Sequence, residues 1–431
     1  MTYANIILPL PLEGLFTYGV PDALASRVQV GVRVRVPLGK SKTYVGIVAE
    51  YPVALPASDS GVVDNEKKIV YKDILEVLDA TPILLPQQLR LWRWISDYYM
   101  SPIGDVYKAA LPSGLKAEDG YRPRTELYVR LADNFRNERN LTLMIDAMKR
   151  ASKQVEVLMA YLRLAGVDGV EHLTTETPLR EVTREELMND THTTIGVIRA
   201  LSDRKLLVTY EKEVGRLNDN VLPHPEHIKP LNEAQTEAYN QILIQMMGHP
   251  VTLLHGVTSS GKTEIYIHLI QKAIDEHKQV LYLLPEIALT VQITERLKAV
   301  FGNRLGIYHS KYSDAERVEI WQKQLSTQPY DVILGARSAV FLPFQRLGLV
   351  IIDEEHEQSF KQQDPAPRYH ARSASIVLAQ MYAGAKTLLG TATPSMETYY
   401  NAQQGKYGLV ELTRRYKDIH LPAIEVVDVK D

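Results

Sequence analysis

The carboxy-terminal half of the sequence alternates short apolar segments with longer amphipathic ones. The apolar segments have the length of buried strands and lie at residues 251–254, 280–284, 332–334, 349–352 and 387–389. Short apolar strands that alternate with helical patterns are typical of a parallel β-sheet with helices on both faces. We therefore predict an α/β lobe with a parallel sheet over residues 231–431.

A glycine-rich segment follows the first of these strands. Residues 256–263 match the phosphate-loop pattern GxxxxGK[ST], and a predicted helix follows at 264–275. Backbone N–H groups of such a loop surround phosphate oxygens, and the helix N-terminus attracts negative charge. We predict that Lys262 reaches the β- and γ-phosphates of ATP and that the Thr263 hydroxyl binds Mg²⁺. The loop residues predicted to bind ATP are Gly256, Thr258, Ser259, Ser260, Gly261, Lys262 and Thr263.

An acidic run follows the apolar segment 349–352 and begins with Asp353 and Glu354. Such a run is often a solvated loop, but a carboxylate at the end of a buried strand beside a phosphate loop is placed to hold the metal of the nucleotide. We predict that Asp353 binds Mg²⁺ and that Glu354 positions or deprotonates the attacking water. The predicted catalytic residues are Lys262, Asp353 and Glu354.

The amino-terminal region has a strand pattern. Valine occupies every second position from residue 28 to residue 36, which predicts one apolar and one polar face. Five basic residues and no acidic residue occur from 27 to 42, so the polar face is either solvated or meets phosphates. A helix is predicted over 86–99, and a Pro-Ser-Gly sequence at 112–114 marks a boundary. We predict a mainly β domain over residues 1–112.

The middle of the chain has a helical pattern over residues 121–212. Thr183 is predicted to cap one helix, and a strand is predicted over 205–210 after a second helix. That second helix, over 191–203, is expected to bury Ile195, Ile198 and Leu201. Helix, helix, strand is the order of a winged-helix domain, which binds DNA or has an architectural or protein-binding role. Residues 213–230, with three prolines, are predicted to be a linker.

Composition excludes several classes of protein. The length of 431 residues predicts two to four domains. The 49 Lys and Arg nearly balance the 52 Asp and Glu, so the chain is not a uniformly basic nucleic-acid coat. No apolar run approaches the ~18–20 residues that cross a bilayer. The absence of cysteine excludes thiol nucleophiles and cysteine-based zinc sites within the chain. We expect a cytoplasmic protein that does not bind membranes.

These motifs, in this order, resemble those of superfamily-two helicases. Residues 284–290, 335–341 and 390–395 are similar to helicase motifs Ia, Ib and III, and 231–235 is similar to the motif whose glutamine contacts adenine. The resemblance implies a RecA-like helicase lobe in which Gln235 contacts ATP.

Further segments resemble the PriA family of primosomal replication-restart helicases, and the likeness extends over essentially the whole chain. Residues 353–372 are similar to the metal box and the aromatic-rich loop of the family. Residues 16–18, 34–40 and 98–104 are similar to its amino-terminal domain, which binds the 3′ end of the leading strand at a fork. The helical segment matches its winged-helix domain.

The aromatic-rich loop carries side chains that suit single-stranded DNA. We expect Phe360 and Tyr369 to offer faces for base stacking, and Lys361, Arg368 and Arg372 to contact phosphates. The alternative is that the aromatic side chains pack on the sheet. By resemblance, the DNA-binding set also includes Phe16, Thr17, Tyr18, Gly39, Lys40 and Arg337. The residues expected to couple DNA binding to hydrolysis are Glu355, His356, Thr391 and Thr393.

The chain departs from the family pattern at three positions. Thr17 stands where the family often has Asp, which reads the terminal base, so we expect weaker or different recognition of the 3′ end. Residues 364–367 replace a segment that often contains tryptophan. Ser373 stands where Asp is common.

The resemblance implies ATP-driven 3′-to-5′ movement on single-stranded DNA, which opens stalled forks and initiates primosome assembly. Its cofactors are ATP and Mg²⁺. Its partners are forked and single-stranded DNA, primosome loading proteins and single-strand DNA-binding protein, in the cytoplasm at the nucleoid. A fork-binding scaffold with a regulatory nucleotide site, and a duplex translocase that does not separate strands, are the alternatives.

The family also has a second helicase lobe, a cysteine-rich zinc-binding insertion and a carboxy-terminal domain. We therefore expect this chain to be an amino-terminal fragment, with zinc only in the missing part. An arginine from the second lobe contributes on the order of 10³–10⁵ in rate in such motors, so the fragment should hydrolyse ATP very slowly.

Overall fold

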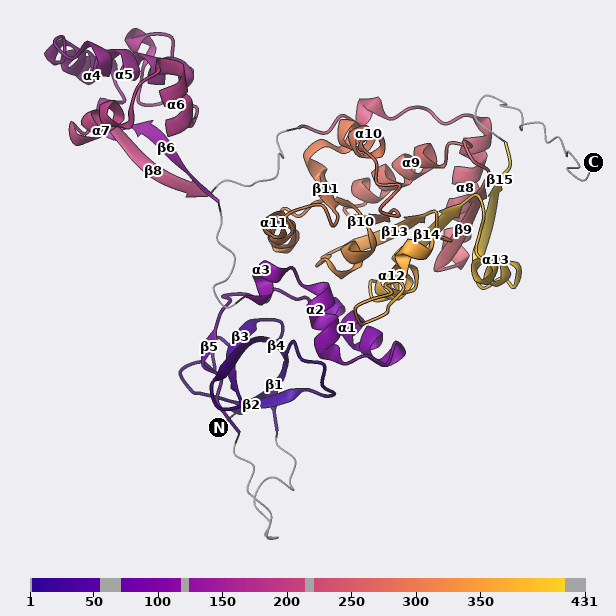
Figure 1. Ribbon diagram of the computed structural model, residues 1–431. Helices are drawn as coiled ribbons and strands as arrows, with labels where there is room; N and C mark the ends of the chain where they lie inside the picture. Colours follow the sequence, from indigo (N-terminus) through magenta and orange to yellow (C-terminus); the bar gives the residue numbers. More distant parts are fainter. Residues whose placement is uncertain (1, 55–70, 118–123, 214–220, 415–431) are drawn as a thin grey trace, which may run out of the picture. The chain divides into compact units, whose positions relative to one another are not determined.

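The computed structural model (Figure 1) describes residues 2–54, 71–117, 124–213 and 221–414. The chain divides into two compact units, one formed by Met1–Tyr121 with Leu217–Asp431 and the other by Arg122–Arg216. The predicted domain boundaries remain predictions, and residues 214–220 of the predicted linker and 415–431 of the predicted lobe lie outside the described residues.

The amino-terminal part of the first unit is an antiparallel sheet with strand order β2-β1-β4-β3-β5. Its strands are β1 (Thr2–Ile7), β2 (Phe16–Val20), β3 (Arg33–Leu38), β4 (Lys42–Val53) and β5 (Glu76–Val77). The predicted alternation holds within β3, where Val34 and Val36 are fully buried. The prediction of a strand from residue 28 is wrong, because the backbone turns at residues 30–31, and Val30 is 37% exposed.

The arginines of β3 pair within the domain. Arg33 forms a fork-like ion pair with Asp79, with a shortest distance of 2.7 Å, and both side chains are largely buried. Arg35 pairs with Glu76 on the neighbouring strand. Two of the five basic residues are therefore paired with carboxylates outside the basic run, and neither the solvated nor the phosphate-binding interpretation describes Arg33.

Three helices join this sheet to the lobe within the first unit: α1 (Pro86–Tyr98), α2 (Ile103–Ala110) and α3 (Ser113–Lys116). One hydrophobic core includes side chains from these helices and from the carboxy-terminal lobe. The Trp321 indole donates to the Ile83 carbonyl at 2.9 Å, and the buried Gln88 amide donates to the Phe341 carbonyl at 2.6 Å. The two parts therefore share one interior.

The second unit has the predicted winged-helix order. A three-stranded sheet, order β7-β6-β8, is built from β6 (Thr125–Leu131), β7 (Val182–Thr183) and β8 (Leu207–Glu213). Its helices are α4 (Glu138–Ala147), α5 (Ser152–Leu164), α6 (Arg184–Thr191) and α7 (Ile195–Asp203). Thr183 caps α6 as predicted, and its hydroxyl accepts from the Glu186 amide at 3.0 Å. The helix predicted over 191–203 begins only at Ile195, which is 47% exposed rather than buried, since His192 ends α6 in the left-handed conformation.

The carboxy-terminal lobe contains the predicted parallel sheet, with strand order β11-β12-β10-β13-β14-β9-β15. The five predicted strands correspond to β9 (Val251–Gly256), β10 (Gln279–Leu283), β12 (Val332–Gly335), β13 (Leu347–Asp353) and β14 (Lys386–Thr391). The sheet also contains two short edge strands that the sequence pattern does not predict, β11 (Leu305–Tyr308) and β15 (Gly408–Leu412). The main helices are α8 (Glu233–Gly248), α9 (Lys262–Asp275), α10 (Val291–Phe301), α11 (Asp314–Leu325), α12 (Ala371–Gln380) and α13 (Met396–Gln403).

The strand order places three motif-bearing strands side by side, as Figure 1 shows for β13, β14 and β9. Both pairings, β13 with β14 and β14 with β9, are parallel, so the phosphate loop after β9, the acidic run after β13 and the segment after β14 lie at one edge of the sheet. Part of the predicted linker packs on the lobe, because the His224 amide donates to the Val300 carbonyl at 2.8 Å. Among the described residues, no helix has the length and apolarity needed to span a membrane.

Candidate nucleotide-binding site

The phosphate loop joins β9 directly to α9, which begins at Lys262, two residues earlier than predicted. Gly261 is the N-cap residue with φ +82°, and a Cβ there would overlap the Gln235 side-chain amide. A side chain at this position is therefore strained by the backbone conformation, and it would force the Gln235 amide to move. Lys262 is buried and its ammonium donates to the Gly256 carbonyl at 3.0 Å, across the mouth of the loop.

Gln235 connects α8 to this loop. It forms a capping box with Asn232 at the start of α8, with distances of 2.9 and 3.0 Å. Its side-chain N–H₂ lies 3.4 Å from the carbonyls of Ser260 and Gly261. Gln235 is buried, and both ends of its amide contact protein, so its predicted contact with adenine remains a prediction.

The loop also presents groups that suit a phosphate ligand. Thr258 and Ser259 are exposed, whereas the Ser260 hydroxyl is buried and has no hydrogen-bond partner among the described residues. Buried hydroxyls normally have a partner, so an unsatisfied one inside an anion-binding loop fits an absent oxygen ligand. The Val257 amide donates to the Leu412 carbonyl at 3.1 Å, which fixes the loop to β15.

Asp353 ends β13, next to Gly390 on β14. Its Oδ1 accepts from the Tyr266 hydroxyl at 2.9 Å and from the Glu354 amide at 3.2 Å. Burial, and then the Glu354 charge, raise the pKa of Asp353 to about 6, while Lys262 opposes that shift. The loop that carries Lys262 follows β9 and Asp353 ends β13, and these two strands lie on either side of β14. Burial raises the pKa of Tyr266 well above its usual value, so its hydroxyl remains a donor.

Glu355 lies beside this carboxylate and has no exposed surface. It pairs with Arg372, and it accepts from the Ser395 amide at 2.7 Å and from the Thr398 hydroxyl at 2.9 Å. The side chain thus joins three segments: the end of β13, the start of α12 and the start of α13. Nη1 of Arg372 is engaged with Glu355, Ser395 and Thr398, and the expected contact of Arg372 with DNA phosphates remains a prediction.

The other predicted coupling residues lie together. His356 Nδ1 is 2.8 Å from the Thr391 hydroxyl, and His356 Nε2 is 3.4 Å from the Thr393 hydroxyl. The Thr393 amide donates to the Thr391 hydroxyl at 3.1 Å. The acidic run and the segment after β14 are therefore connected by direct hydrogen bonds.

The aromatic-rich loop does not present its aromatic faces. Phe360 and Tyr369 are each 1% exposed, so the prediction that they stack on bases is wrong and the packing alternative holds. Tyr369 packs edge-to-face on Phe341 with ring centroids 5.0 Å apart. These rings are buried because the loop folds back on itself, with a bridge between Lys361 and residue 370.

The basic side chains of the loop remain nearer the surface. The Arg368 side chain is 64% exposed and lies near Asp364. The Lys361 ammonium lies 4.9 Å above the ring centroid of Tyr99 and donates to the Arg368 carbonyl. Arg337 donates to the Lys361 carbonyl at 3.1 Å, which links the loop to the segment after β12.

Comparison with known proteins follows the same division of the chain. A family model for the 3′ DNA-binding domain of PriA matches residues 5–112, one for the winged-helix domain of PriA helicase from Bacteroidota matches 126–214, and one for DEAD/DEAH box helicases matches 232–402. The replication restart protein PriA of Haemophilus influenzae is 35% identical over the full chain, which covers 54% of that relative. The PriA of Bacillus subtilis is 31% identical, again over the full chain and 58% of the relative. The chain belongs to the PriA family.

The chain spans about half the length of the curated PriA relatives that it matches. Among solved structures, RecG bound to a three-way DNA junction is similar with 23% identity and a TM-score of 0.33, over 46% of this chain and 25% of that chain. A score this low carries no argument about function.

Most of the residues that PriA-family resemblance suggests for DNA binding belong to the amino-terminal sheet, with Phe16, Thr17 and Tyr18 on β2 and Gly39 and Lys40 in the turn after β3. The Tyr18 hydroxyl donates to the Pro37 carbonyl at 3.1 Å, which links β2 to the end of β3. Lys40 is exposed, and Phe16 is half-buried. The Thr17 hydroxyl donates to Asn5 Oδ1 at 2.8 Å, so Thr17 already has a partner within the sheet.

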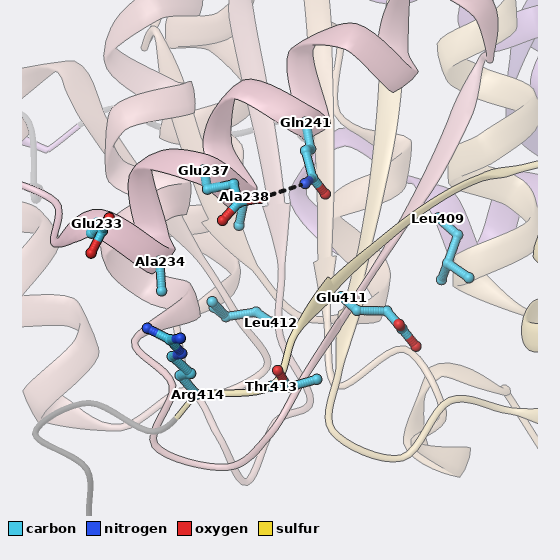
Figure 2. A pocket seen from close by; sticks show the side chains of 10 residues that line it. All are labelled: Glu233, Ala234, Glu237, Ala238, Gln241, Leu409, Glu411, Leu412, Thr413 and Arg414. Carbon is cyan, nitrogen blue, oxygen red and sulfur yellow. Dashed lines mark hydrogen bonds between the residues drawn. The ribbon is translucent and has the colours of Figure 1, made fainter.

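A hollow of about 560 Å³ lies between α8 and β15 (Figure 2). Glu233, Glu237 and Glu411 line it together with Arg414, and Figure 2 shows the hydrogen bond between Gln241 and Glu237. None of the predicted catalytic or DNA-binding residues lines this hollow. In the described parts of the chain, no three His, Asp or Glu side chains are grouped so as to hold a metal.

Sequence reasoning missed several residues of the site. Tyr266 lies one helical turn after Lys262, on the same face of α9, and this i, i+4 spacing is the signal that could have found it. Ser395 and Thr398 begin α13 and carry the spacing of a helix cap. Their contact with Glu355 has no local signal.

Proposed function

We propose that this chain is the fork-recognising and nucleotide-binding part of an ATP-dependent 3′-to-5′ DNA helicase that acts in replication restart. The observation that carries the proposal is the single site formed by Lys262, Asp353 and the hydrogen-bonded pair His356 and Thr391, within a chain that matches PriA proteins along its full length. A phosphate loop, a metal-binding acid and a coupled third segment are the parts from which phosphoryl-transfer motors are built.

The donor set fits a nucleotide with Mg²⁺. Asp353 and Thr263 supply carboxylate and hydroxyl oxygens, the ligands that Mg²⁺ prefers, and the Ser260 hydroxyl of the loop is buried without a partner among the described residues. When bound, the cation neutralises charge on the phosphates. We infer that Lys262 leaves the Gly256 carbonyl to pair with the phosphates, and that Glu354 orients the attacking water or accepts its proton.

The proposed coupling between DNA binding and ATP hydrolysis depends on the segments that contact Glu355. Glu355 and Arg372 connect the acidic run to both ends of the aromatic-rich loop and to α13. DNA that contacts exposed Arg368 would displace a loop whose ends are fixed to the nucleotide site. We propose that this displacement moves Glu354 and His356, because both adjoin Glu355 in the chain.

DNA recognition is proposed for two surfaces, the aromatic-rich loop with exposed Arg368 and the amino-terminal sheet. The amino-terminal sheet, with Phe16, Thr17, Tyr18, Gly39 and Lys40, is proposed to receive the 3′ end of a strand at a fork. Forked and single-stranded DNA are the proposed ligands, and primosome loading proteins and single-strand DNA-binding protein are the proposed partners, in the cytoplasm at the nucleoid.

The test uses Lys262→Ala. Nucleotide binding by the 431-residue chain is measured with a fluorescent non-hydrolysable ATP analogue, and DNA binding is measured with a labelled fork. The proposal predicts lost nucleotide binding with fork binding intact, and lost strand displacement when the same change is made in the full reading frame that contains this chain. Retained replication-restart activity in that variant would favour a fork-binding scaffold. ATPase activity without strand displacement in the unchanged protein would favour a duplex translocase.

A further inference from the structure

We propose that Tyr266 is a positioning residue whose hydroxyl orients the Asp353 carboxylate toward the divalent cation of the bound nucleotide. This inference rests on the proposed function, because it assigns a role to a residue of the same site. Tyr266 is fully buried on α9, four residues after Lys262. The helix that carries the phosphate-loop lysine therefore also carries the donor that holds the metal-binding acid on β13.

The geometry fixes one oxygen of the carboxylate. The Tyr266 hydroxyl and the Glu354 amide both donate to Oδ1 of Asp353, at 2.9 and 3.2 Å. Because Oδ1 has two donors from different elements, rotation of the carboxylate would break at least one hydrogen bond. We assign Oδ2 as the oxygen that faces the cation. Partners of this kind, one step behind a metal ligand, orient the ligand and contribute to metal affinity.

The surroundings hold the ring of Tyr266 in place. It packs edge-to-face on Tyr282, with ring centroids 5.6 Å apart. On its other side lies Gly390, where an added Cβ would overlap the Tyr266 hydroxyl and would lie 2.9 Å from Cζ. Only a glycine leaves room for the hydroxyl to reach Asp353. The absence of a side chain at Gly390, near the end of β14, thus allows the phosphate-loop helix to contact the acidic run.

Tyr266→Phe isolates the hydroxyl, because the ring and its packing remain. Affinity of the 431-residue chain for a fluorescent non-hydrolysable ATP analogue is measured in EDTA and across a Mg²⁺ titration. We expect unchanged affinity in EDTA and a half-saturating Mg²⁺ concentration about 10–100-fold higher than in the unchanged chain. Gly390→Ala should shift the titration in the same direction.

Tyr382→Phe is the matched control. Tyr382 is also a buried tyrosine of the lobe, and its hydroxyl donates to the Phe344 carbonyl at 2.6 Å, away from the nucleotide site. It should lose a comparable hydrogen bond without any change in the Mg²⁺ titration. A Tyr266→Phe titration that superimposes on that of the unchanged chain, or an equal shift in Tyr382→Phe, would overturn the assignment. If the unchanged chain binds no nucleotide with or without Mg²⁺, the proposed function itself fails.

Discussion

Replacing Arg372 with alanine removes the cation from a carboxylate that has no exposed surface. Breaking a buried ion pair at one partner typically costs about 3–5 kcal/mol, because the other charge stays buried without compensation. Glu355 would retain the Ser395 amide and the Thr398 hydroxyl as donors, so we expect the lower end, about 3 kcal/mol. For a lobe of this size, that corresponds to a fall of about 6–12 °C in the melting temperature.

Calorimetry of the 431-residue chain tests this value. The double variant Glu355→Gln with Arg372→Ala buries a neutral amide instead of an unpaired charge, so it should melt above Arg372→Ala alone by several degrees. Arg368→Ala is the control, because an exposed arginine of the same loop should change stability by less than about 0.5 kcal/mol.

Two outcomes would refute the reasoning. If Arg372→Ala melts within about 2 °C of the unchanged chain, its guanidinium does not compensate a buried charge in solution. If the double variant melts below the single variant, the cost arises from lost packing and not from the unpaired Glu355. If Arg372→Ala instead lowers DNA affinity without changing the melting temperature, the prediction that Arg372 contacts DNA phosphates is supported.

Three further predictions follow from the same region and from the phosphate loop. Burial lowers the pKa of His370 to about 4. The folded state therefore binds fewer protons than the unfolded state, so the free energy of unfolding should fall as the pH drops from about 6.5 to about 4. We expect a fall of about 1–2 kcal/mol after solvent screening. In urea titrations, His370→Gln should remove this dependence on pH. Gly261→Ala should weaken binding of the ATP analogue while fork binding persists, because the left-handed backbone strains a side chain and the added Cβ would displace the Gln235 amide. Arg368→Ala should weaken single-stranded DNA binding and reduce its salt dependence by about one counterion, and an unchanged salt slope would show that Arg368 makes no phosphate contact.

Much of the site could be predicted from the sequence because its parts are local. The phosphate loop needs a strand before it and a helix after it, and both were recognisable from apolar runs of the right length. Asp353 was found because it ends a continuous apolar strand. The five central strands were predicted for the same reason, whereas β11 and β15 were missed because short edge strands with glycine and polar residues have no continuous apolar run.

The long-range partners were decided only by the tertiary structure. Phe360, Tyr369 and Arg372 have the residue types of a DNA-binding loop, and nothing nearby in the chain indicates that two are buried and the third pairs with Glu355. Likewise, the contact between Tyr266 and Asp353 spans 87 positions and depends on the absence of a side chain at Gly390. A sequence pattern indicates local structure, because strands, helices and turns depend on residues that are close together in the chain. Which side chains meet is decided when the strands take their order in the sheet and the loops fold over its edge.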